Sequence, residues 1–150
     1  MKKLFLVLLF LCIVGVWFSF TNEWDVANQD YTADEWEILE LHNFVRGYIW
    51  LEELEIDSDL TDLALERCKY VYRTEKLTHW WHFNNLADEY IAEKDVNFVW
   101  ENLGQFYFNN LSLMMAWIKS PTHLDNILFK EYRYIGIVDY WPYTCVSFST

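Results

Sequence analysis

Helix-like and strand-like segments follow one another in this chain in an order that restricts the fold. Apolar residues recur at helical spacing over most of the chain after residue 32. Two strand-like segments, 134–140 and 143–148, close the chain, with Pro142 in the turn between them. We therefore expect an α+β domain, an α–β–α sandwich in which helices cover a small central antiparallel sheet.

The first two helices have clear start signals. Thr32-Ala-Asp-Glu35 is a capping-box pattern and predicts a helix from Thr32 to about residue 49. Ser58 is expected to cap a second helix. The residues of this second helix that fall on one apolar stripe are Leu60, Ala64, Cys68 and Val71.

The middle of the chain is harder to assign. Asn84-Asn85 indicates a loop, followed by a short helix over 86–92. Residues 98–103 are expected to be extended or to form a turn. A further helix is predicted over 111–118, and Pro121 is expected to end it.

The N-terminal residues form an export signal. Lys2 and Lys3 precede a nearly unbroken apolar run, residues 4–20, which has about the length of a short membrane-spanning helix. Bulky side chains at 16–20 offer no small-x-small cleavage site, which favours an uncleaved anchor over a cleaved signal peptide. We expect residues 1–20 to be this signal or anchor, 21–33 a polar tether, and 34–150 a single domain outside the cytoplasm.

Charge excludes some partners. The net charge is −12, and without Lys2 and Lys3 it becomes −14, from 9 basic against 23 acidic side chains. Such a surface repels nucleic acid and anionic lipid, so membrane contact is expected only through the N-terminal segment. It favours cationic ligands and divalent metals, although an acidic surface also serves solubility alone.

Two cysteines remain beyond the N-terminal segment. Outside the cytoplasm Cys68 and Cys145 can form a disulfide. Two buried free thiols are the alternative, because the sequence does not give the distance between them.

One segment near the C-terminus suggests a site. It reads Trp117-Ile-Lys-Ser-Pro-Thr-His123-Leu-Asp-Asn-Ile-Leu128. A helix that ends at Ser120-Pro121 presents His123 on the following turn, where its imidazole can meet a carboxylate from an earlier element.

Five stretches together resemble the CAP superfamily of cysteine-rich secretory, antigen 5 and pathogenesis-related proteins, in its compact bacterial form. They are Asn43-x-x-Arg46, Leu60 to Arg67, Leu77-Thr-His79, Glu101-Asn102-Leu103, and the Trp117 to Leu128 segment with Ile135-Gly136-Ile137 after it. The resemblance covers roughly residues 35–148 and implies the same α–β–α sandwich. Asn43 and Arg46 are expected to brace the packing, with Arg46 reaching a carboxylate or carbonyls between elements.

The resemblance implies a cleft that holds two histidines and two acidic residues: His79, Glu89, Glu101 and His123. Asp88 is the rival of Glu89, and His82 is the rival of His79. The chain departs from the family at Trp100, where glycine usually precedes the glutamate.

Two imidazoles can bind a divalent ion such as zinc, and carboxylates can orient the rings. His79 and His123 are therefore the candidate metal ligands, and such a metal would be weakly held and open to solvent. The alternative is that the histidines and acids only hydrogen-bond to one another and hold the walls of the cleft together.

Two functions follow from this reading. The first is a non-enzymatic, monomeric binding module for a metal, a small apolar ligand or an extracellular protein; Trp80-Trp81 and Tyr140-Trp141 offer apolar surface, with core packing as their alternative role. The second is a metal-assisted hydrolase, protease-like, with Glu101 as general base and Glu89 as a second catalytic acid. Two histidines are fewer protein ligands than catalytic zinc sites usually have, and the sequence shows no activated nucleophile. It therefore favours the first function.

Overall fold

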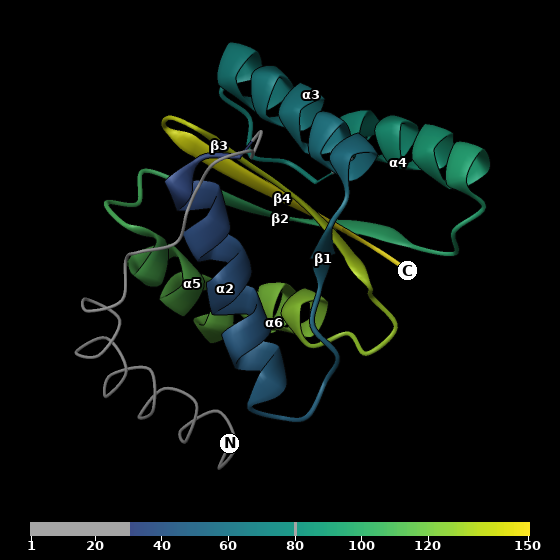
Figure 1. The fold of residues 1–150 in the computed structure, drawn as a ribbon. Coiled ribbons are helices and arrows are strands. Elements are labelled where there is room, and N and C mark those ends of the chain that lie inside the picture. The colour runs from purple at the N-terminus through teal and green to yellow at the C-terminus, as the bar shows by residue number, and fades with distance from the viewer. Residues whose placement is uncertain (1–30, 80) are drawn as a thin grey trace. The chain divides into compact units, whose positions relative to one another are not determined.

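The computed structural model describes residues 31–79 and 81–150 (Figure 1). Residues 33–150 form one compact unit. The predicted signal or anchor, residues 1–20, lies outside the described residues, as do most of the predicted tether and Trp80. None of the helices within 31–79 and 81–150 has the length and apolar character needed to cross a bilayer.

The sheet has four strands in the order β1-β3-β4-β2. They are β1 (Glu55–Ile56), β2 (Val99–Gln105), β3 (Tyr134–Tyr140) and β4 (Tyr143–Ser149). The predicted hairpin around Pro142 is confirmed, since β3 and β4 pair antiparallel up to Tyr140 and Tyr143. β2 pairs antiparallel with β4 along its whole length, and β1 pairs parallel with β3 at the other edge.

Helices cover both faces of this sheet. They are α2 (Ala33–Gly47), α3 (Ser58–Thr74), α4 (Trp81–Lys94), α5 (Asn110–Lys119) and α6 (Pro121–Ile127). Figure 1 shows α3 and α4 on one face, and α2, α5 and α6 on the other. The predicted α–β–α sandwich is confirmed.

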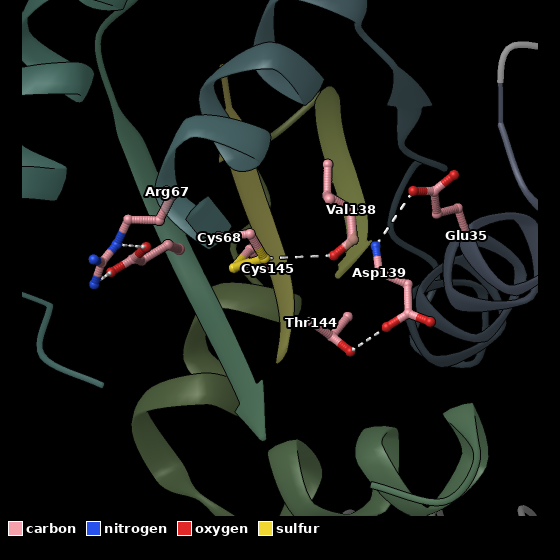
Figure 2. The surroundings of a disulfide bond; sticks show 8 residues. Glu35, Arg67, Cys68, Val138, Asp139, Thr144 and Cys145 are labelled. Atoms are coloured by element: carbon pink, nitrogen blue, oxygen red, sulfur yellow. Dashed lines mark hydrogen bonds and ion pairs between the residues drawn. A yellow bond between two sulfur atoms is a disulfide. The ribbon is translucent and has the colours of Figure 1, made fainter. Parts of the chain in front are cut away.

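The core forms where the apolar stripe of α3 meets the sheet. The four predicted stripe residues, Leu60, Ala64, Cys68 and Val71, have no exposed surface. Ala64, Cys68 and Val71 pack with Leu103 of β2 and Val138 of β3. A disulfide joins Cys68 to Cys145 and so links α3 covalently to β4 (Figure 2).

On the opposite face of the sheet, Arg46 connects several segments through hydrogen bonds to backbone carbonyls, as the sequence predicted. Its guanidinium is buried and donates hydrogen bonds only to backbone carbonyls. These belong to Glu52, Ile127, Phe129 and Tyr132. One side chain thus ties the end of α2 to the segment between α6 and β3.

Two helix starts differ from the prediction. α3 is capped by Asp57 instead of Ser58, because the Asp57 carboxylate accepts a hydrogen bond of 2.7 Å from the Leu60 N–H. Pro121 does more than end α5. It occupies the first turn of α6, where its missing N–H costs nothing.

The predicted loop at Asn84-Asn85 is wrong. α4 runs through both residues, because Phe83, Ala87 and Tyr90 are buried in a cluster with Leu60 and Leu63 of α3. Tertiary packing on this stripe outweighs the turn preference of the two asparagines.

Candidate functional site

Glu101 lies at the centre of the candidate site, on edge strand β2. The residue is buried, with 3% of its surface exposed. Arg67 of α3 pairs with both carboxylate oxygens: its Nε lies 2.7 Å from Oε2, and its Nη2 lies 3.0 Å from Oε1. Figure 2 shows Arg67 next to Cys68 on α3, with its side chain turned away from the disulfide. The pairing compensates the cost of burying two charges.

His79 reaches the same carboxylate from the loop after α3. Its Nδ1 lies 3.0 Å from Glu101 Oε1, and its side chain is half exposed. Arg67 Nη2 also donates a short hydrogen bond to the carbonyl of Thr78, the residue before His79. Arg67 therefore holds both the carboxylate and the loop that carries the imidazole.

His123 is placed by amide hydrogen bonds between β2 and α6. Asn102 Nδ2 donates to the carbonyl of His123 at 3.1 Å. Asn126 Nδ2 donates to the carbonyl of Glu101 at 3.0 Å and to Asn102 Oδ1 at 2.9 Å. These three hydrogen bonds fix the position of α6 relative to β2, and so the position of His123 relative to Glu101.

As a result, the two imidazoles lie on one surface. The ring centroids of His79 and His123 are 6.0 Å apart, with the planes inclined by 61°. Partial burial lowers the pKa of His123 below its ordinary value, and the neighbouring charge of His79 acts in the same direction, against the opposing effect of Glu101. His123 is therefore mostly neutral at pH 7, and a neutral ring nitrogen can accept a proton or a metal.

The structure brings together three of the four predicted tetrad residues: His79, Glu101 and His123. Glu89 lies exposed on α4, seven residues after His82 and therefore on the same helix face. Within the described part of the chain, no hydrogen bond or ion pair joins Glu89 to the other three. Asp88 is exposed as well.

His82 does not take the place of His79. Its ring stacks on Tyr70 of α3 at a centroid distance of 3.8 Å. Burial lowers its pKa, and the charges of Arg67 and Arg73 add to this effect. Across residues 31–79 and 81–150, no three His, Cys, Asp or Glu side chains are grouped as a complete ligand set for a metal.

Sequence reasoning missed the residues that build the site: Arg67, Asn102 and Asn126. Arg67 carried a signal, because it falls three residues after Ala64 and joins the buried stripe of α3. A charged residue on an apolar stripe requires a buried partner of opposite charge. The two asparagines stood inside the recognised motifs, but their spacing of 24 residues does not reveal that they meet.

Trp100 occupies the position where the family usually has glycine. Its side chain is 56% exposed, because successive residues of β2 alternate between the two sides of the strand and the one after it, Glu101, is buried. Trp100 does not adopt a positive φ. The backbone here is ordinary extended strand, which accepts any side chain.

Comparison with known proteins agrees with this fold. Residues 39–140 match the model of the cysteine-rich secretory protein family, CAP. No curated protein matches the sequence.

Three solved bacterial structures are similar in fold. An outer surface protein from Borrelia burgdorferi has a TM-score of 0.71 at 20% identity, over 81% of this chain and 96% of that one. A cysteine-rich secretory protein from Staphylococcus aureus has a TM-score of 0.69 at 18% identity, over 85% of this chain and 41% of that one. An extracellular protein with an SCP domain from Bacillus anthracis has a TM-score of 0.69 at 16% identity, over 81% and 45%.

This chain therefore spans less than half the length of the Staphylococcus and Bacillus proteins. The family model covers most of the chain, and it includes the segments that carry His79, Glu101 and His123. The chain belongs to the cysteine-rich secretory protein family, the CAP superfamily.

Proposed function

We propose that this chain is an extracytoplasmic, non-enzymatic binding module. Its imidazole pair, His79 and His123, takes up a divalent cation such as zinc, and its exposed surface takes a small apolar ligand or another protein. The observation that carries the proposal is the two-point ion pair between Glu101 and Arg67.

This ion pair argues against Glu101 as a general base. A base must accept a proton, and protonating Glu101 would leave the Arg67 guanidinium buried without its counter-charge. Breaking a buried pair in this way costs about 3–5 kcal/mol. Because its carboxylate is paired with the buried Arg67, Glu101 can orient His79 but is poorly suited to accept a proton.

The two histidines fit a cation. Two ring nitrogens that each lie about 2 Å from one tetrahedrally coordinated zinc ion place their ring centroids about 5 Å apart. The observed centroid distance is 6.0 Å, so the two rings would have to approach one another by about 1 Å to share an ion. Glu101 engages Nδ1 of His79, so the other ring nitrogen, Nε2, is the one available for a metal, as in sites where a carboxylate orients a ligand imidazole.

Such a cation would exchange easily. The protein supplies two nitrogens, and the side chain of His79 is half exposed. Structural zinc sites, by contrast, close around the ion with four protein ligands. When bound, the ion would add a positive centre to an acidic protein surface.

Several observations support a location outside the cytoplasm. The disulfide between Cys68 and Cys145 is the kind of bond that persists in oxidising compartments. Lys2 and Lys3 before the apolar run have the pattern of an export signal. Two of the similar structures are described as an outer surface protein and an extracellular protein.

Zinc titration by calorimetry tests the proposal. We expect the wild-type chain to bind zinc, and both His79→Ala and His123→Ala to weaken binding at least tenfold. His82→Ala is the matched control, because His82 stacks on Tyr70 and should leave binding unchanged. An equal loss of zinc affinity in all three variants would mean that the metal does not bind between His79 and His123.

Absence of zinc binding in the wild-type chain would remove the metal from the proposal and leave an apolar-ligand or protein binder. Turnover of peptides or esters is the second measurement. We expect none above the background of Glu101→Gln. Zinc-dependent turnover that disappears in this variant while the variant remains folded would replace the binding module with the hydrolase.

A further inference from the structure

Four exposed aromatic side chains gather at one end of the domain. Phe106, Tyr107 and Phe108 follow β2, and Trp141 stands in the turn between β3 and β4; their exposed fractions are 62%, 38%, 95% and 65%. The rings of Phe106 and Trp141 meet edge to face at 6.4 Å, and the Phe106 N–H donates to the carbonyl of Pro142. The two loops therefore present one surface, which we call the aromatic tip.

The chain enters the domain at this same end. Asn110, two residues after Phe108, donates through its side chain to the carbonyl of Asp34 and to Glu37 Oε2 in the first turns of α2. Glu35 Oε1 accepts a hydrogen bond from the N–H of Asp139, two residues before Trp141 (Figure 2). Figure 1 likewise shows the start of α2 near the β3–β4 turn and the loop after β2.

We propose that the aromatic tip rests in the interfacial layer of the bilayer that holds the N-terminal segment. The proposal rests on the extracytoplasmic location in the proposed function and on residues 4–20 acting as an uncleaved anchor. Residues 21–32 reach at most about 40 Å when fully extended. An anchor at residues 4–20 would therefore keep the start of α2 within about that distance of the membrane.

The residue types at the tip suit a lipid interface. Trp and Tyr concentrate at membrane–water boundaries, because their rings are apolar and carry one polar group. The acidic residues beside the tip, Asp34, Glu37 and Asp139, disfavour anionic lipid. The preferred surface is therefore zwitterionic, such as phosphatidylcholine, and the membrane contact extends beyond the N-terminal segment alone.

Trp50 provides a matched control at the other end of α2. It is 94% exposed, against 95% for Phe108. It follows the end of a helix of 15 residues, which is about 22 Å long. The two positions are alike in exposure and differ in their distance from the point where the chain enters the domain.

The experiment uses the full chain with Cys12→Ser, reconstituted in phosphatidylcholine vesicles. A nitroxide label is attached at Phe108→Cys or at Trp50→Cys, with Cys68 and Cys145 left as a disulfide. Collisions with oxygen, which concentrates in lipid, are compared with collisions with a water-soluble nickel chelate. We expect the oxygen-to-nickel ratio at position 108 to exceed that at position 50 several-fold. Phe106→Ser with Trp141→Ser should remove the difference.

Equal ratios at positions 108 and 50 would overturn the docking. A label at 108 that is shielded from both reagents would also overturn it, in favour of a protein or a second copy of the chain as the occupant. Flotation of the full chain with the vesicles tests the anchor separately. A chain that does not float refutes the anchor and the docking together, whereas a floating chain with equal ratios refutes the docking alone.

Discussion

Arg67 and Glu101 meet at two points in the interior, Nε to Oε2 at 2.7 Å and Nη2 to Oε1 at 3.0 Å, with almost no exposed side-chain surface on either residue. The pair joins α3 to edge strand β2. His79 contacts the ion pair from the solvent-exposed side, because its Nδ1 lies within hydrogen-bond distance of Glu101 Oε1. The exposed imidazole is therefore oriented by a charge pair that solvent barely reaches.

Replacing Arg67 with methionine should destabilise the fold strongly. The apolar side chain keeps most of the volume but leaves Glu101 buried without a counter-charge, and it removes the hydrogen bond to the Thr78 carbonyl. We expect the free energy of unfolding, measured in urea, to fall by about 3–5 kcal/mol.

Arg73→Met is the control for this change, because Arg73 is exposed on the same helix. It should alter stability by no more than about 0.5 kcal/mol. Adding Glu101→Gln to Arg67→Met should recover part of the loss. Equal effects of the two arginine substitutions would mean that the ion pair contributes nothing.

His42 should make the stability depend on pH. The ring is fully buried between Trp117 and Phe148, and its Nδ1 lies 2.7 Å from the carbonyl of Ile38. Burial lowers the pKa of His42 from 6.5 to about 4, although the hydrogen bond to Ile38 opposes this shift.

Because the folded-state pKa of His42 lies below the unfolded value, the folded state favours the neutral ring. Its contribution is fully present above pH 6.5 and is lost as the pH falls toward 4, by about 3 kcal/mol in all. His42→Asn keeps a donor near Nδ1 and does not titrate. The difference in unfolding free energy between wild type and this variant should shrink or reverse across this pH window. A constant difference would contradict the prediction.

Gly136 should not tolerate even alanine. A Cβ at this position in β3 would collide with the backbone of Leu60 and Thr61 at the start of α3, where no side chain can rotate away. We expect Gly136→Ala to lower the thermal midpoint markedly, with a loss of at least about 1–3 kcal/mol from overpacking. Gly47→Ala is the control: a Cβ there meets nothing within 4 Å, so stability should stay equal or rise.

The disulfide should contribute substantially to stability. Cys68 and Cys145 are 77 residues apart, so the bond closes a long loop in the unfolded chain. Replacing both cysteines with alanine should cost about 4 kcal/mol. Urea unfolding of this variant and of the wild type under reducing conditions should agree. A reduced wild type as stable as the oxidised protein would exclude a stabilising role.

The sequence alone determined the features that depend on local pattern. The stripe of α3 and the hairpin around Pro142 follow from apolar periods of 3.6 and 2 residues, whereas the segment that carries Glu101 could have been a strand or a turn. The order of the motifs was enough to identify the family and its sandwich fold. It also singled out His79, Glu101 and His123, because these residues stand within or at the end of recognisable segments.

Only the tertiary structure decided which partners these residues have. The asparagines at 84 and 85 are helical because packing on α3 outweighs their local preference. Arg67 meets Glu101 across 34 residues, and Asn126 meets Asn102 across 24, through contacts that no local pattern encodes. A sequence period tells which side of an element is buried, but the identity of the opposing side chain depends on how the elements pack, and that is set by the whole core at once.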